Sequence, residues 1–135
     1  MQTDSKESYT LCFAPMLYLK NVADGIDFYK KAFDAKELRR WSNDDGSVHV
    51  AEMTIESAMF HLHEEVKRAN ELSPMTLNGT TTVLGIFVNN PDAFMSKAIA
   101  AGATEISPMQ DYDYGYRQGD IKDPFGHKWT FQKSI

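Results

Sequence analysis

The chain has 135 residues, a length that fits one domain with its own core. Hydrophobic residues make up 42% and charged residues 24%, and the net charge of -5 comes without any basic cluster. These values argue against a protein that grips nucleic-acid phosphates, and no apolar run is long enough to cross a membrane. The polar N-terminus lacks the apolar segment of a secretory signal, and Cys12, the only cysteine, cannot form a disulfide within the chain. We therefore expect a cytoplasmic protein.

The first half of the chain predicts a strand, a helix and three more strands. Residues 1–10 are polar and are expected to be flexible, whereas Cys12 lies in an apolar segment and is expected to be a buried strand thiol. Apolar side chains recur at helical spacing up to Phe33, and Asp34 ends the helix. A hairpin turn is expected at 43–46. The expected strands are 11–20, 36–43, 47–55 and 59–64, with a helix at 26–33 after a cap at 21–25.

The second half repeats this order after a polar linker at 66–80. Sliding the chain by 68 residues places Asn21 on Asn89 and Asp24 on Asp92, with turn residues in matching places. The sequence therefore predicts one α+β domain over 11–135, built from two tandem βαβββ modules, about 11–65 and 81–133. They would form a curved mixed sheet around a cavity. The expected elements of module two are a helix at 91–101 and strands at 81–89, 104–110, 116–122 and 128–133.

Near the C-terminus the chain carries the motif Asp123-Pro124-Phe125-Gly126-His127-Lys128-Trp129, which resembles a family signature. The vicinal oxygen chelate superfamily (glyoxalases, bleomycin-resistance proteins, extradiol dioxygenases) has a similar closing motif, and the Phe-Gly-His-x-Trp form is similar to its PhnB-like branch. The helix at 26–33 also resembles that branch, and the resemblance covers roughly 13–132. The motif itself predicts structure: a turn at its start, Trp129 and Phe131 on the core side of the last strand, and His127 stabilising the turn.

The resemblance also implies four positions for a divalent metal that binds vicinal oxygens. They lie on the first and fourth strand of each module, where family enzymes have His, Gln or Glu. Only a histidine among the residues at these positions is a usual ligand, so we expect neither the family's metal centre nor another cofactor. A methyltransferase is not expected either, because no Gly-rich cofactor loop follows a strand. The four positions fall on Ala14, Thr82 or Val83, His61 or Leu62, and Thr130.

His61 and His63 leave a second interpretation open. Two residues apart in a predicted strand, they share a face and can begin a displaced site for zinc, nickel, manganese or iron. The alternative is a pair of hydrogen-bonded or partly exposed residues at a strand end. The side chains that would complete such a site are His49, Glu52, Glu64 and Glu65.

Arg117 is the best candidate for ligand recognition. An arginine that follows Tyr114 and Tyr116 in the chain can bind a carboxylate or phosphate while the rings stack on a planar ligand, and an ion pair with a nearby Asp is the equal alternative. With Thr130 and His61 these residues form the predicted ligand-binding set. The first functional hypothesis is a metal-independent small-molecule binding protein, and the resemblance implies a homodimer. The others are a metal-dependent lyase, isomerase or dioxygenase using the displaced histidines, and an interaction module without a ligand.

Overall fold

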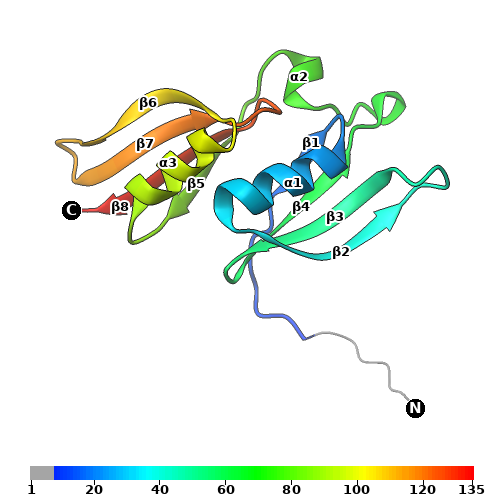
Figure 1. Ribbon diagram of the computed structural model, residues 1–135, viewed down its shortest axis with the longest axis horizontal. Helices are drawn as coiled ribbons and strands as arrows, with labels where there is room; N and C mark the ends of the chain where they lie inside the picture. Colours follow the sequence, from blue (N-terminus) through cyan, green and yellow to red (C-terminus); the bar gives the residue numbers. More distant parts are fainter. Residues whose placement is uncertain (1–7) are drawn as a thin grey trace.

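The computed structural model describes residues 8–135 as two four-stranded mixed sheets, each with one long helix on one face (Figure 1). The strand order is β1-β4-β3-β2 in module one and β5-β8-β7-β6 in module two. This confirms the α+β fold and the two tandem modules, but as two separate sheets rather than one. Module one comprises β1 Met16–Leu19, α1 Val22–Phe33, β2 Lys36–Ser42, β3 Val48–Ile55 and β4 Ala58–Glu64. Module two comprises β5 Val83–Phe87, α3 Pro91–Ala100, β6 Thr104–Asp111, β7 Tyr116–Lys122 and β8 Lys128–Ser134.

Both long helices begin at an asparagine cap. The side-chain oxygen of Asn21 accepts from the amide of Asp24 at 3.1 Å, and that of Asn90 accepts from Ala93 at 3.1 Å. As predicted, α1 ends at Asp34, whose φ of 54° is left-handed. The two caps are equivalent, so the helices begin at an offset of 69 residues (90 minus 21), whereas β2 and β3 match β6 and β7 at the offset of 68 expected from the sequence.

Strand pairing supports the same offset. In the parallel pairs next to each module edge, Met16 lies opposite His61, and Gly85 lies opposite Thr130. The sequence match placed the second cap one residue early because Asn89 and Asn90 are neighbours, so either could take the place of the first asparagine cap. The offset is 69 for the first and fourth strands of each module and 68 for the two strands between them.

A shared aromatic core joins the modules. Tyr29 and Phe33 on α1 contact Trp129 on β8, with ring centroids 5.7 and 4.8 Å apart, and Phe33 also contacts Phe131. Helices α1 and α3 pack against each other, and they lie on the same side of the two sheets in Figure 1. Burying this many large rings supplies the main stabilising term, because apolar area is removed from water on both sides of the junction.

The segments outside the modules differ from expectation in two places. The first strand begins at Met16, so Cys12 precedes it and is exposed, which makes the expected buried thiol wrong. The linker contains a 3₁₀ turn, η1 Lys67–Ala69, and a short helix, α2 Pro74–Leu77, capped by Ser73. The expectation of a flexible start concerns 1–10, and residues 1–7 lie outside the described part. No helix in 8–135 is long and apolar enough to span a membrane.

Candidate functional site

Each sheet has one face against its helix and one face without a helix, which we call the open face. Alternate residues of β3 and β4 are buried against α1, so the residues between them point to the open face. Several of these are large or ionisable, unlike the residues that face the helix. The open face of module one comprises Met16 and Tyr18 on β1, Arg39 and Trp41 on β2, Val50, Glu52 and Thr54 on β3, and Met59, His61 and His63 on β4.

A hydrogen-bonded row crosses the open face of module one. Glu52 accepts from Nε of Arg39 at 3.2 Å, and its second oxygen lies 3.1 Å from Nε2 of His61, its cross-strand neighbour. The guanidinium of Arg39 in turn lies 5.3 Å from the ring centroid of Trp41. When the carboxylate accepts in this contact, the proton is on Nε2 of His61, and Nδ1 of a neutral imidazole is then an acceptor.

His63 lies next to this row in a less polar environment. Its ring stacks on that of His61, with centroids 5.7 Å apart, and is tilted against Tyr18 at 5.6 Å. Its Nε2 is buried without a hydrogen-bond partner in 8–135. Desolvation, followed by repulsion from His61 and His49, lowers the pKa of His63, so the ring is held neutral. His49 itself lies apart from the row, with Nδ1 3.1 Å from Glu64.

Module two has an equivalent pair on its open face. Thr130 donates to Oδ1 of Asp120 at 2.6 Å, and these two residues are cross-strand neighbours as His61 and Glu52 are. Tyr116 lies on the same face, and its ring meets that of Phe87 at 5.9 Å. The two modules therefore place a hydrogen-bonded donor and acid at the same point of each open face.

Arg117 lies on the other side of β7. Its guanidinium donates to both oxygens of Asp92, at 2.8 and 2.7 Å, and to Asp111 at 2.9 Å. Asp92 belongs to the first turn of α3, so Arg117 faces the helix and not the open face. The sequence left two roles open for Arg117, ligand recognition or an ion pair with a nearby Asp, and the geometry matches the ion pair. The predicted ligand-binding set is thus divided: Tyr116 and Thr130 lie on one open face, His61 on the other, Tyr114 in the β6–β7 turn, and Arg117 behind the sheet.

The signature motif builds a buried network that sequence reasoning did not predict. Asp123, 3% exposed, accepts from Nε1 of Trp129 at 2.9 Å and from the amides of Phe125 and His127 at 2.9 and 3.0 Å. It also accepts a short hydrogen bond from the hydroxyl of Tyr29 on α1. Burial, and then the Asp123 charge, raise the pKa of Tyr29. We call these groups the Asp123 network, and it links module two to the helix of module one.

His127 makes a second link between the modules. Its backbone amide helps to form the turn, as expected, but its Nε2 lies 3.0 Å from the carbonyl oxygen of Tyr18 on β1. This role is wider than the predicted one of stabilising a turn. The sequence carries no signal for it, because the partner is a backbone carbonyl 109 residues away.

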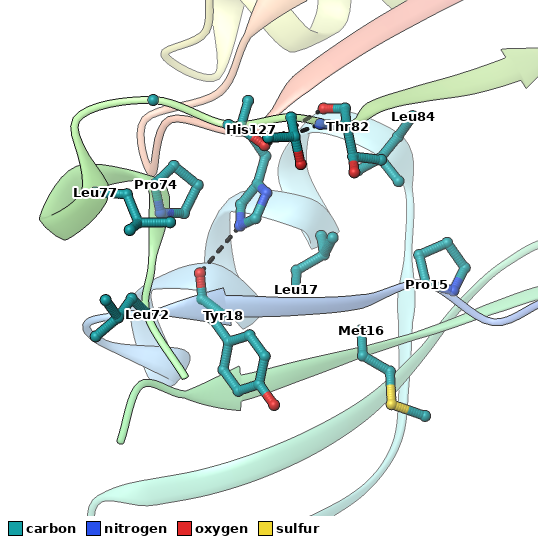
Figure 2. Close-up of a pocket in the computed structure, with 13 residues that line it drawn as sticks. Pro15, Met16, Leu17, Tyr18, Leu72, Pro74, Leu77, Thr82, Leu84 and His127 are labelled. Atoms are coloured by element: carbon teal, nitrogen blue, oxygen red, sulfur yellow. Dashed lines mark hydrogen bonds between the residues drawn. The ribbon is translucent and has the colours of Figure 1, made fainter. Parts of the chain in front are cut away.

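Two cavities lie between the modules, where β1 and β5 are the edge strands. The larger, about 620 Å³, is bounded by β1, the linker with α2, the start of β5 and His127 (Figure 2). We call it the junction cavity. The other, about 490 Å³, lies toward Phe13, Met59 and Phe87. Both have the size of small-molecule sites.

Comparison with known proteins identifies the family. The model of the glyoxalase/bleomycin resistance protein/dioxygenase superfamily matches residues 13–131. The chain belongs to this superfamily. An uncharacterized protein of Mycobacterium bovis is 34% identical over 125 residues, which cover 90% of this chain and 82% of that protein.

Solved structures of the superfamily's fold are similar over most of the chain. TioX from Micromonospora sp. ML1 is 21% identical with a TM-score of 0.74, covering 93% of this chain and all (100%) of that one. A gene product of Arabidopsis thaliana is 26% identical with a TM-score of 0.69, covering 91% of this chain and 98% of that one. These likenesses bear out the fold predicted from the sequence.

The residues at the superfamily's metal positions do not fit a divalent ion. The offset of 69 between the first and fourth strands of the two modules pairs Ala14 with Val83 and His61 with Thr130. Leu62 is fully buried in the core. Two of the four positions are therefore apolar, and the other two are hydrogen-bonded to acids. Within 8–135 no three His, Cys, Asp or Glu side chains converge as metal ligands would.

Proposed function

We propose that this superfamily member binds a small molecule on its open faces without a metal at the superfamily's usual position, and that it belongs to the PhnB-like branch. One observation carries the proposal. At the equivalent point of each open face, His61 and Thr130 are hydrogen-bonded to an acid, and their first-strand counterparts, Ala14 and Val83, offer no donor atom. Such a site can recognise polar groups of a ligand, but it lacks the ligands that hold a Lewis acid.

The chemistry of module one favours a planar, largely uncharged ligand. The charges of Glu52 and Arg39 neutralise each other in an ion pair, so the row does not favour a charged ligand. Trp41, 44% exposed, supplies a flat apolar surface beside it. Nδ1 of His61 can accept a hydrogen bond from a ring N–H or hydroxyl. A planar aromatic compound with one donor group matches this arrangement.

A homodimer would complete the site. The open faces and the edge strands carry large exposed apolar side chains, with Met16 57%, Val83 56% and Phe87 64% exposed. Pairing two copies through these faces would enclose a ligand between them and remove the apolar area from water. Light scattering at micromolar concentration is expected to give twice the mass of one chain. A mass of one chain would contradict the dimer.

The test combines metal analysis with a thermal-shift screen. The purified protein is expected to contain less than stoichiometric metal, and to gain stability with planar aromatic compounds but not with zinc, nickel, manganese or iron. His61→Ala should remove the gain. The matched control is His49→Ala, which changes a histidine of β3 outside the row. Metal bound tightly at one equivalent would overturn the proposal, as would a gain that His61→Ala leaves intact.

One observation favours a second candidate function. The unpartnered Nε2 of His63 next to His61 is the kind of group that a displaced metal could use. In that case the protein would be a lyase, isomerase or dioxygenase of the superfamily. A metal-induced rise in melting temperature that disappears in the double variant His61→Ala/His63→Ala would support this candidate.

A further inference from the structure

The junction cavity is lined mostly by apolar side chains, and although Met16 and Tyr18 of the open face border it, no residue of the row on that face lines it. Its walls include Leu17, Leu72, Leu77 and Leu84, and none of its lining residues is Asp, Glu, Lys or Arg. Figure 2 shows His127 and Leu17 on one side of β1, whereas Tyr18 and Met16 point to the other side, toward the open face. A ligand here would contact leucines from both modules and from the linker.

The linker holds the wall of this cavity in place. A Cβ atom on Gly126 would come within 2.8 Å of Pro74, so the first residue of α2 packs directly on the signature turn. Gly126 also has a φ of 95°, which favours glycine. The position of α2, and with it the wall that Leu77 forms, is therefore set by the same motif that places His127.

His127 gives the cavity a defined polar group. Since a carbonyl oxygen only accepts, its contact with Tyr18 places a proton on Nε2, and the neutral ring then has an acceptor at Nδ1. His127 is 9% exposed, and Nδ1 has no hydrogen bond to other residues of 8–135. Among the side-chain polar atoms of 8–135, only Nε2 of His63 is fully buried without a hydrogen-bond partner. Nδ1 of His127 has no partner either but is not fully buried, so it is accessible from the cavity that the His127 ring lines.

We infer that the junction cavity is a second binding site, for an uncharged, mostly apolar small molecule with one hydrogen-bond donor, such as a hydroxyl or amide N–H. The leucines exclude charge, because a buried unpaired ion is costly. Nδ1 of His127 selects the donor, and Thr80 and Thr82 are among the residues that line the same cavity. The site is independent of the proposed function, since it uses neither His61 nor Glu52.

The experiment compares two probes that differ in one donor, 2-naphthol and 2-methoxynaphthalene. Ligand titrations by NMR, with leucine methyl groups labelled, measure affinity and location together. We expect 2-naphthol to bind about two- to tenfold more tightly, the usual effect of one neutral hydrogen bond. The methyl signals of Leu17, Leu72 and Leu84 should shift, whereas that of Leu38 on β2, outside the cavity, should not.

Two tryptophan variants on α2 complete the test. Leu77→Trp would place a ring in the cavity and is expected to weaken 2-naphthol binding by roughly tenfold or more, because it displaces the ligand's apolar contacts. Met75→Trp is the matched control, since Met75 is 57% exposed on the same helix and does not line the cavity. His61→Ala should leave binding of 2-naphthol here unchanged.

Four results would overturn the inference: no binding of either probe at millimolar concentration, equal affinity for both probes, equal effects of the two tryptophan variants, or binding that His61→Ala removes. Binding that His61→Ala removes would place the probe on the open face instead. That outcome would support the proposed function while refuting the second site.

Discussion

Replacing Tyr29 with Phe removes one hydroxyl from the Asp123 network and leaves the ring packing intact. The buried carboxylate of Asp123 keeps Trp129 and two backbone amides as donors, but loses its link to module one. A hydrogen bond to a charged group is worth about 1.5–3 kcal/mol, so the free energy of unfolding should fall by about that amount. Urea denaturation followed by fluorescence and by circular dichroism measures the loss.

The control for this prediction is Tyr116→Phe, which removes a hydroxyl from a half-buried tyrosine outside the network and should change stability by less than about 0.5 kcal/mol. Asp123→Ala should be more damaging than Tyr29→Phe, since it leaves Tyr29 and Trp129 without an acceptor. If Tyr29→Phe is no more destabilising than the control, the network does not hold the modules together.

The Tyr29 substitution also has a pH signature. The folded-state pKa of Tyr29 is raised above the unfolded value of 10.0, so folding favours the neutral phenol. This contribution is fully present below the unfolded pKa and is lost as the pH rises toward the folded one. The wild-type protein should therefore lose stability in alkali more steeply than Tyr29→Phe. Parallel alkaline profiles would refute the assigned cause.

Further predictions concern acid stability, the caps and a tightly packed glycine. Since folding lowers the pKa of His63 below 6.5, its contribution is lost as the pH falls through that value, and melting temperatures should fall less steeply in acid for His63→Gln. Equal slopes would contradict this. Asn21→Ala and Asn90→Ala should each cost about 1 kcal/mol in urea denaturation, and unequal losses would contradict the equivalence of the caps. Gly119→Ala would bring a Cβ within 2.5 Å of Met95 and 3.1 Å of the β6 backbone, so denaturation should show a loss of about 1–3 kcal/mol; wild-type stability would show that the contact relaxes freely.

The sequence predicted the order of elements well, because breakers and apolar periodicity are local signals. It placed Trp129 and Phe131 correctly on the core side of β8, since alternation within a strand needs no tertiary information. The start of β1 was wrong, because an apolar composition alone does not show that residues such as Cys12 find a neighbouring strand to pair with.

Site residues were harder to place. The tyrosines just before Arg117 suggested a recognition group, but Tyr116 and Arg117 are strand neighbours and so point to opposite faces. The decisive partner, Asp92, is 25 residues away on α3 and becomes visible only when the helix packs on the sheet. The links made by Tyr29 and His127 were missed for the same reason, although alternation in β4 correctly put His61 and His63 on one face.

The Asp123 network lies on the helix side of the sheets, whereas His61 and Thr130, with their acidic partners, lie on the open faces. A substitution on an open face therefore leaves the joint between the modules untouched, and the chain can exchange one ligand chemistry for another without losing its architecture. The closing motif is then a marker of assembly rather than of reactivity. Sequences that carry it can be expected to share this joint while differing in what they bind.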